Sequence, residues 1–298
     1  MNVVTTQRLS LRYGRRVGIE AVDLLVPEGE IFGFLGPNGA GKTTTIRVLL
    51  GMLRPGSGTA TIFGLDSWRD SHRIKRQVGY LPGDLRLYPW LTAERALRIG
   101  SQVRGQDIER VGRELAVRFQ LDTSLAVRRM SRGTRQKLGV VLALAHQPRL
   151  LVLDEPTSGL DPLMRDELAS CMRELAANGH TVFFSSHTLS EVEQLCHRVA
   201  VVRAGRVVAA DTIDTLRRQA RRTVTLQFCN AAAASSVVPP DFLEILERSG
   251  PRWTCDLVGS APVLVRWAAE QPIDDMTIAP PSLESLFRRF YQTEENSP

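Results

Sequence analysis

The chain has 298 residues, a net charge of +6 and 43% hydrophobic residues, which fits one large folded domain accompanied by a small one. Its longest apolar run, 138–145, is far shorter than the roughly 20 residues that span a bilayer, and the start of the chain carries no secretory signal. We therefore expect a chain that does not cross a membrane by itself. The four cysteines form no CxxC pair, which argues against a zinc site or disulfide framework and favours a reducing cytosol.

The beginning of the chain reads as three strands and a helix. Residues 3–11 and 19–26 are rich in β-branched and apolar residues and are separated by glycines, so two strands are expected there. Residues 30–35 read as a buried strand, which ends in a glycine-rich loop over 36–41. Residues 42–50 then have helical character. A glycine-rich loop between a strand and a helix is a favourable place to bind phosphate.

This loop carries a complete phosphate-binding motif. Residues 36–43 read Gly-Pro-Asn-Gly-Ala-Gly-Lys-Thr, which matches the P-loop pattern GxxxxGK[ST]. Its glycines let backbone amides approach phosphate oxygens, and the following helix presents free N–H groups and a partial positive charge. Lys42 is expected to reach the β- and γ-phosphates of ATP, and the Thr43 hydroxyl to ligate Mg²⁺. The predicted nucleotide-binding residues of the loop are Gly36, Pro37, Asn38, Gly39, Ala40, Gly41, Lys42, Thr43 and Thr44.

The middle of the chain changes from alternating elements to a long helical stretch. Strands are expected at 59–63 and 78–81, and the pattern over 92–144 is helical, with charged faces and few β-branched runs. Elsewhere the alternation of strands and helices predicts a mainly parallel sheet covered on both faces. We therefore interpret the helical stretch as a subdomain inserted into the sheet domain.

Two apolar strands come next. Residues 150–153 and 181–184 are each followed by a turn and a helix. The second of these helices is expected to begin at Ser190, with a capping box to the glutamate three residues later. Residues 199–202 and 206–208 flank an Ala-Gly pair, which is a hairpin signal.

Two carboxylates end the first of these strands. Asp154 stands at its carboxyl end and Glu155 follows directly. Such an aspartate holds Mg²⁺, usually through water, so Thr43 and Asp154 are the predicted metal ligands. Glu155 is placed to polarise the attacking water, a role worth about 10² to 10⁴ in rate. The alternative, a carboxylate pair that only marks a strand end, is weak beside a complete P-loop.

His187 follows the strand over 181–186. A lone histidine is more often structural than catalytic, but ligands in parallel sheets bind at the carboxyl ends of strands. A neutral imidazole there could hydrogen-bond the γ-phosphate and sense its loss. We therefore predict Lys42, Glu155 and His187 as the catalytic residues.

The character of the chain changes after residue 216. Low-complexity sequence occupies 231–240. Strands at 223–228 and 263–267 and a helix at 282–291 suggest a small α+β appendage. A regulatory or interaction role for this appendage is left open.

These motifs together resemble one family, the ATP-binding subunits of ABC transporters. Residues 130–137 read Met-Ser-Arg-Gly-Thr-Arg-Gln-Lys and are similar to the family's signature loop, usually Leu-Ser-Gly-Gly-Gln. Ser131 and Gly133 match that loop, whereas Met130, Arg132 and Thr134 depart from it. Variants of this kind resemble the drug and antibiotic (daunorubicin-type) exporter subgroup.

Further residues carry the resemblance. Residues 158–161, Ser-Gly-Leu-Asp, look like the loop that crosses the family's dimer interface, so Asp161 joins Ser131 and Gly133 as an implied nucleotide-site residue. His187 looks like the switch histidine, and Tyr13 sits where the family stacks an aromatic ring on adenine. An early aromatic residue is otherwise more often part of a core.

The resemblance implies an α/β fold: a P-loop NTPase (RecA-like) core with an antiparallel β subdomain and an inserted helical subdomain at about 85–146. The ABC ATP-binding domain would cover 1–217, and 218–298 would form the accessory α+β domain. It also implies an ATPase that closes as a dimer, with a second copy or a paralogue, around ATP and Mg²⁺. Its other partner would be an integral membrane permease subunit, with no nucleic acid bound. The chain would then lie peripherally on the cytoplasmic face of the cell membrane and power export.

One departure from the family concerns the strand over 78–81. It should lead to a glutamine that touches Mg²⁺ and the attacking water, but Gly83 holds that position. Asp84 or a water molecule is a candidate substitute, unless the contact is missing altogether. The segment 85–92 would still form the coupling surface.

Two other classes of protein also carry a P-loop. Soluble ABC-type ATPases that act on ribosomes or DNA usually carry two ATPase domains or a long coiled-coil insertion, and neither feature occurs in this sequence. P-loop kinases and other nucleotide-binding modules lack a signature loop before the aspartate strand. The transported substrate itself cannot be predicted, because the pathway would lie on another polypeptide.

Overall fold

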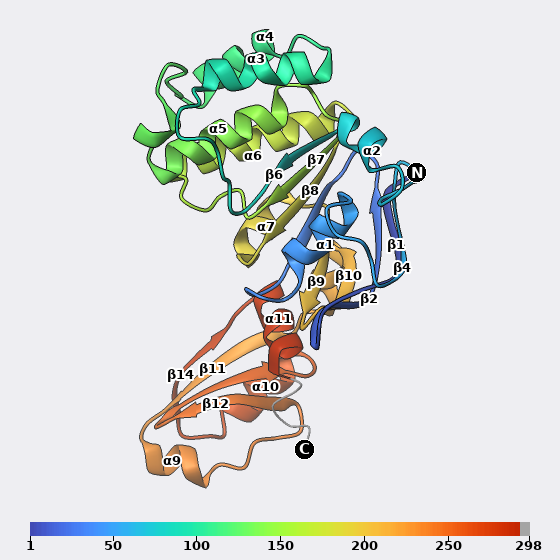
Figure 1. Cartoon of the computed structure of the whole chain (residues 1–298). Coiled ribbons are helices and arrows are strands. Elements are labelled where there is room, and N and C mark those ends of the chain that lie inside the picture. The colour runs from blue at the N-terminus through green and yellow to red at the C-terminus, as the bar shows by residue number, and fades with distance from the viewer. Residues whose placement is uncertain (293–298) are drawn as a thin grey trace. The chain divides into compact units, whose positions relative to one another are not determined.

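The computed structural model describes residues 1–292 and divides into two compact units, Met1–Asp211 and Thr212–Pro298 (Figure 1). The boundary lies just before helix α8 (Ile213–Gln219), a few residues ahead of the division at residue 217 suggested by the sequence. Within the described residues, no helix has the length and apolar character needed to cross a membrane. Each unit has its own hydrophobic core.

The first unit begins with a four-stranded antiparallel sheet. Its strands are β1 (Asn2–Tyr13), β2 (Arg16–Pro27), β4 (Ser57–Ile62) and β5 (Leu65–Asp66), in the order β2-β1-β4-β5. β1 and β2 pair along almost their whole lengths, from the Asn2–Pro27 pair to the Tyr13–Arg16 pair at the turn. The antiparallel β subdomain implied by the family resemblance is therefore present, and it carries Tyr13 at its tip.

A six-stranded sheet forms the centre of the first unit. Its strands are β3 (Ile31–Leu35), β6 (Val78–Leu81), β7 (Leu150–Asp154), β8 (Thr181–Ser186), β9 (Arg198–Arg203) and β10 (Arg206–Thr212), in the order β10-β9-β3-β8-β7-β6. The pairs β9–β3, β3–β8, β8–β7 and β7–β6 are all parallel. Every residue of β3, β7 and β8 is buried, which fits the apolar residues that fill most of β3 and β7 and the middle of β8. Because the strands are parallel, their carboxyl ends meet at one edge.

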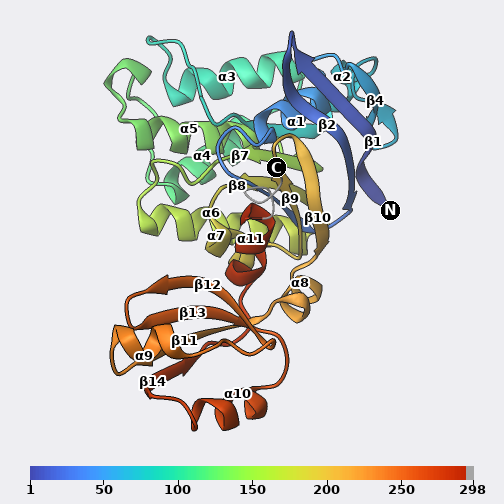
Figure 2. The ribbon, with the colours of Figure 1, turned by 90° about the horizontal axis from the view of Figure 1, so that it is seen from below.

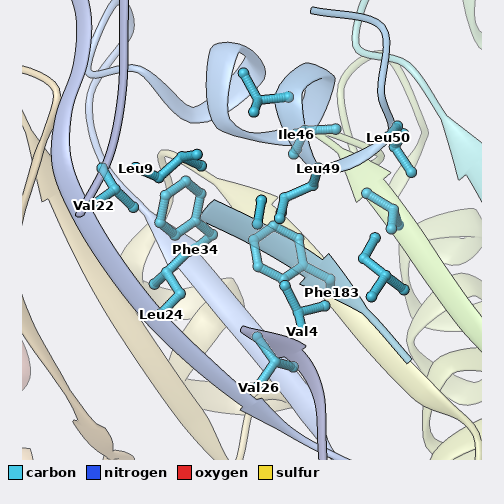
Figure 3. Packing of buried hydrophobic residues seen from close by; sticks show 14 of the residues in the cluster. Val4, Leu9, Val22, Leu24, Val26, Phe34, Ile46, Leu49, Leu50 and Phe183 are labelled. Atoms are coloured by element: carbon cyan, nitrogen blue, oxygen red, sulfur yellow. The ribbon is translucent and has the colours of Figure 1, made fainter. Parts of the chain in front are cut away.

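Helices cover the central sheet and share its core. α1 (Lys42–Leu49) contacts β7 and β4, while α6 (Pro162–Ala177) and α7 (Leu189–Leu195) contact β3 and β8. Apolar side chains from α1, the antiparallel sheet and the central sheet interlock in one cluster (Figure 3), and the rings of Phe32 and Phe183 stack at 5.8 Å. Burial of Ile46 and Leu49 in this cluster fixes the helix that follows the P-loop.

The predicted helical insertion is present. Its helices are α3 (Ala93–Arg104), α4 (Glu109–Arg118), the short 3₁₀ turn η1 (Val127–Arg129) and α5 (Arg132–Leu144), and the three α-helices contact one another. α5 begins at Arg132, with the Ser131 side chain accepting a hydrogen bond from the Thr134 backbone N–H. A further helix, α2 (Ser71–Gln77), precedes β6 and was not predicted.

The expected capping box at Ser190 is wrong. α7 already begins at Leu189, so Ser190 lies inside the helix and Thr188 is the N-terminal flanking residue. The hydroxyl of Ser186 instead accepts a hydrogen bond from the Thr188 N–H at 2.9 Å and donates to the carboxylate of Glu191 at 2.7 Å. Ser186 therefore joins the residue before α7 to Glu191 in its first turn, without capping a helical N–H group.

The second unit is a separate α+β body (Figure 2). Its sheet comprises β11 (Arg222–Phe228), β12 (Leu243–Ser249), β13 (Arg252–Leu257) and β14 (Ile273–Ile278), in the order β12-β13-β11-β14. Its helices are α8, α9 (Ala231–Ser236), α10 (Ala261–Ala268) and α11 (Leu283–Gln292). Trp253 and Phe228, whose ring centroids are 4.8 Å apart, occupy its core.

One local prediction for this unit is wrong. The strand expected at 263–267 lies within helix α10, where Leu264 and Ala268 are buried four residues apart, as on one face of a helix. Part of the low-complexity segment 231–240, for which no element was predicted, folds as α9 and is capped by the Asn230 side chain. The expected strands and helix suggested an α+β body here, and that coarser prediction is consistent with the structure.

Candidate active site

The P-loop connects β3 to α1 at the edge where the parallel strands end. The Gly36 N–H donates to the Ser186 carbonyl oxygen at 3.1 Å, which joins the loop to β8. Gly41 has φ of 105°, and a Cβ atom there would lie 2.8 Å from the Gly18 carbonyl oxygen. Only glycine suits both that conformation and that spacing. Gly41 therefore allows the tight turn by which the loop enters α1.

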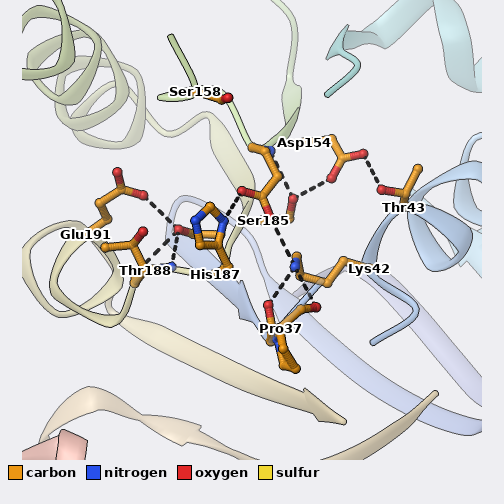
Figure 4. Close-up of polar contacts among 12 residues, drawn as sticks. Pro37, Lys42, Thr43, Asp154, Ser158, Ser185, His187, Thr188 and Glu191 are labelled. Atoms are coloured by element: carbon orange, nitrogen blue, oxygen red, sulfur yellow. Dashed lines mark hydrogen bonds and ion pairs between the residues drawn. The ribbon is translucent and has the colours of Figure 1, made fainter. Parts of the chain in front are cut away.

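Lys42 lies at the centre of a line of charged groups (Figure 4). Its ammonium donates to the carbonyl oxygens of Gly36 at 2.6 Å and Pro37 at 3.1 Å. The same Nζ atom is 3.0 Å from Glu155 Oε1, and the other carboxylate oxygen of Glu155 contacts His187 Nδ1. The Lys42 side chain is only 5% exposed, and these contacts hold its ammonium group against the P-loop.

A second set of hydrogen bonds is built around Asp154. Its Oδ2 accepts from the Thr43 hydroxyl at 2.7 Å, and its Oδ1 accepts from the Ser185 hydroxyl at 2.6 Å. Ser185 Oγ in turn accepts from the Glu155 N–H at 3.1 Å. Hydroxyl and carboxylate oxygens are the ligands that Mg²⁺ prefers, so Thr43 and Asp154 form a donor pair that fits this ion.

The backbone of Glu155 is strained. Its φ of 52° places a non-glycine residue in the left-handed region. Such conformations cost of order 1–3 kcal/mol and concentrate at functional sites. Its carboxylate is 20% exposed, between Lys42 and His187. The fold therefore holds Glu155 in an unfavourable backbone conformation that aims its side chain at the P-loop.

A cavity of about 280 Å³ lies beside the P-loop, lined by its residues together with Tyr13, Arg16 and Glu155. The Tyr13 ring is 45% exposed, and its hydroxyl lies 3.4 Å from the Thr44 hydroxyl. An exposed ring above a phosphate loop offers a surface on which a base can stack.

The predicted residues of the signature loop and of the loop over 158–161 lie elsewhere in the unit. Ser131, Gly133 and Asp161 do not line this cavity. Ser131 caps α5 through the Thr134 N–H at 3.1 Å, and the Asp161 carboxylate caps α6 through the Met164 N–H at 2.9 Å. A Cβ atom on Gly133 would lie 2.7 Å from the Gly159 carbonyl oxygen, so the two segments pack closely.

Gly83, which holds the position of the family's glutamine, lies beside Asp154. A Cβ atom there would be 3.2 Å from the Asp154 carbonyl oxygen and 3.6 Å from its Oδ2. Gly83 itself supplies no side chain to the site. The Asp84 carboxylate is 71% exposed and pairs with Arg86 at 2.9 Å.

Sequence reasoning missed two groups of residues at the site. Ser185 joins Asp154 to Glu155, and its only signal is a polar residue near the carboxyl end of a buried strand. Arg132 and Gln136 reach the loop after Glu155, bonding Ser158 Oγ at 2.7 Å and the Pro156 carbonyl oxygen at 2.9 Å.

Comparisons with known proteins identify the family of the chain. Residues 19–158 match the domain family described as ABC transporter. The bacitracin transport ATP-binding protein of Bacillus licheniformis is 36% identical over 80% of this chain and 79% of its own length. The daunorubicin resistance ATP-binding protein of Streptomyces coeruleorubidus is 37% identical over 72% of this chain and 70% of its own length. A solved ATP-binding subunit of an ABC transporter superposes with a TM-score of 0.69 at 34% identity, covering 73% of this chain and 92% of that one. The chain therefore belongs to the ABC transporter family, as an ATP-binding subunit that hydrolyses ATP to power movement across a membrane.

Proposed function

We propose that this chain drives export as one of two ATP-binding subunits that close over two nucleotides. The observation that carries the proposal is the separation of two half-sites on one chain. The P-loop, Lys42 and Glu155 line one cavity, whereas Ser131 and Gly133 lie outside it at the start of α5. A helix start is suited to bind an anion, and a second subunit would bring its nucleotide to this one.

Each predicted residue has a role in the proposed reaction. Lys42 would turn from Glu155 to the β- and γ-phosphates, and the Tyr13 ring would stack on adenine. Thr43 and Asp154 would hold Mg²⁺, which when bound neutralises charge on the phosphate oxygens. Asp161 would act at the interface while it caps α6.

Glu155 would accept the proton of the attacking water as the γ-phosphate leaves. It is favoured for this role by its place directly after Asp154 and by its contact with Lys42, which a bound triphosphate would replace. His187 touches the other carboxylate oxygen and would orient Glu155 toward the water and respond to loss of the γ-phosphate.

The partners are proposed on the same basis. ATP can drive closure only if it binds the closed pair more tightly than the open one. Hydrolysis would remove that preference and let the pair open. An integral membrane permease would receive the motion, which places this chain on the cytoplasmic face of the membrane. The names of the relatives, bacitracin transport and daunorubicin resistance, favour an exporter of a toxic compound.

The decisive experiment removes the carboxylate of Glu155. Glu155→Gln should lower kcat by about 10² to 10⁴, because the amide cannot accept a proton, while ATP still binds. With Mg²⁺ and ATP, light scattering on a sizing column should show a nucleotide-dependent dimer of the variant. Glu28→Gln makes the same chemical change at a surface ion pair with Arg149 and should behave as wild type.

Two outcomes would contradict the proposal. One is rapid turnover by the Glu155→Gln variant. The other is a variant that stays monomeric with saturating Mg²⁺ and ATP, both alone and with its membrane partner.

A further inference from the structure

The turn between β9 and β10 joins the P-loop to β2. Gly205 in this turn donates its N–H to the Ala40 carbonyl oxygen at 3.0 Å, and its carbonyl oxygen accepts the Glu20 N–H at 2.8 Å. One residue therefore bonds the phosphate loop on one side and β2 on the other. Arg206 adds a surface ion pair to the Glu20 carboxylate at 2.9 Å. These contacts hold β2 at a fixed distance from the P-loop.

Gly205 occupies a space that admits no side chain. Its φ is 80°, in the left-handed region that favours glycine. A Cβ atom on Gly205 would lie 3.1 Å from the Gly18 carbonyl oxygen and 3.1 Å from Ile19 Cα, which are both backbone atoms of β2. On the other side, a Cβ atom on Gly41 of the P-loop would lie 3.4 Å from Gly205 Cα. The backbones of three segments therefore meet directly, and their spacing depends on glycine.

The same stretch of β2 carries the ring of Tyr13. A Cβ atom on Gly18 would lie 2.9 Å from Tyr13 Cε2 and 3.2 Å from Cδ2, so the ring lies against the Gly18 backbone. Tyr13 and Gly18 both line the cavity beside the P-loop. The position of β2 thus sets the distance between the ring at one end of this cavity and the phosphate loop at the other.

The P-loop is the more firmly held of the two segments. It continues into α1, whose Ile46 and Leu49 are buried in the core, and its Gly36 N–H bonds β8. The turn between β1 and β2, by contrast, is exposed over residues 12–16. The three atoms nearest to a Cβ atom on Gly205 all belong to β2. A group added at Gly205 should therefore displace β2 and the Tyr13 ring and leave the P-loop in place.

We propose that Gly205 is a positioning residue for the base of the nucleotide. Its turn holds β2 at the distance from the P-loop at which the Tyr13 ring covers the base of a nucleotide whose phosphates lie in the loop. Gly205 does not line the cavity and acts through β2. The inference rests on the proposed function, since stacking of the base on Tyr13 is part of it.

The test compares ATP with inorganic tripolyphosphate, which has the phosphates but no base. Gly205→Ala should raise the KM for ATP by about ten-fold, which lies within the worth of stacking one base. Its kcat should stay within about two-fold of wild type, because Lys42 and Glu155 are untouched. The inhibition constant of tripolyphosphate against ATP hydrolysis should also stay within about two-fold, because the P-loop alone binds this ligand.

Two further variants separate the added Cβ atom from backbone strain. Gly205→Asn carries the same Cβ atom, but asparagine tolerates the left-handed region better than alanine. It should raise the KM for ATP as much, with a smaller loss of stability in urea unfolding.

Gly179→Ala is the matched control for strain. Gly179 has φ of 82°, and a Cβ atom there would meet no other part of the chain within 4 Å. It lies between α6 and β8, outside the lining of the cavity. Gly179→Ala should therefore keep the wild-type KM and kcat.

Removal of the ring shows whether Gly205 acts through it. Tyr13→Ala should raise the KM for ATP by about ten-fold or more and leave tripolyphosphate inhibition unchanged. Adding Gly205→Ala to Tyr13→Ala should then change the KM by less than about two-fold, because both substitutions remove one interaction. The inference would be overturned by additive losses in the double variant, by an equal loss of tripolyphosphate inhibition in Gly205→Ala, or by an equal rise in KM in Gly179→Ala.

A failure here is distinguishable from a failure of the proposed function. If Tyr13→Ala weakens ATP binding but Gly205→Ala and Gly205→Asn do not, only the positioning role is refuted. If Tyr13→Ala binds ATP as wild type does, the stacking role in the proposed function is refuted and the positioning role with it. The nucleotide-dependent dimer of Glu155→Gln tests the closure of two subunits independently of both.

Discussion

The two half-sites of this chain differ in how deeply their polar side chains are buried. At the P-loop, Lys42 and Asp154 are 5% and 1% exposed, and each has at least two polar partners. At the start of α5, Ser131 and Arg132 are exposed, and the Arg132 side chain donates one hydrogen bond to Ser158 in the loop after Glu155. The first half-site is preorganised for chemistry. The second leaves its groups accessible to another surface.

The largest effect is expected at the preorganised half-site. Lys42→Ala removes the ammonium that bonds the P-loop and Glu155. Loss of such a clamp on transferring phosphate should lower kcat by roughly 10² to 10³-fold and weaken ATP binding as well. ATP hydrolysis assays and equilibrium nucleotide binding measure the two effects separately.

Lys75→Ala is the matched control, because Lys75 is an exposed lysine in the last turn of α2, outside the cavity. It should keep wild-type rates. If Lys42→Ala were to bind and hydrolyse ATP normally, the first half of the comparison would be wrong.

A smaller and different effect is expected at α5. Gly133→Ala places a methyl group 2.7 Å from the Gly159 carbonyl oxygen, so α5 and the loop after Glu155 must move apart. Overpacking of this size costs about 1–3 kcal/mol, and we expect kcat to fall about ten-fold.

ATP binding by the single Gly133→Ala chain should change little, in contrast to Lys42→Ala. Measurements of kcat and of the ATP dissociation constant on the same variant should show that only kcat changes. An equal loss in both quantities would mean that the half-sites are not functionally separate.

The sequence predicted the preorganised half-site better than the exposed one. Lys42, Thr43 and Asp154 belong to contiguous motifs, and parallel strands bring the ends of such motifs to one edge. The Lys42–Glu155–His187 line follows from the same topology, since β3, β7 and β8 are neighbours. Local pattern and chain topology were enough to place these residues together.

Contacts between loops were beyond the sequence patterns. Ser185 and Arg132 act through side-chain hydrogen bonds to residues 26 or more positions away, and no periodicity encodes them. In the second unit, the short apolar run from Val263 to Trp267 fits a strand as well as a helix. Only the burial of Leu264 and Ala268, four residues apart, shows that it is a helix. Short apolar runs are ambiguous because strand and helix both bury them.

An effect on stability, and not on turnover, is expected just beyond the end of α5, where His146 joins this part of the chain to the central sheet. His146 is 6% exposed, and its Nε2 lies 3.2 Å from the Val78 carbonyl oxygen at the start of β6. Burial, with a smaller contribution from Arg104, lowers the pKa of His146 to about 4 from its ordinary 6.5. The folded state therefore favours the neutral ring, which donates through Nε2.

The sign of the pH dependence follows from that lowered pKa. Above pH 6.5 the ring is neutral in both the folded and the unfolded chain, and its contribution to stability is fully present. As the pH falls from about 6.5 toward 4, only the unfolded chain gains the proton, so we expect a loss of about 3 kcal/mol in the free energy of unfolding. His146→Gln keeps a donor for Val78 but does not titrate. Urea unfolding of both proteins from pH 7.5 to 4 should therefore show a steeper decline for wild type. Parallel declines would mean that this end of α5 is not held by a neutral histidine, and the pH response of the chain would then arise elsewhere.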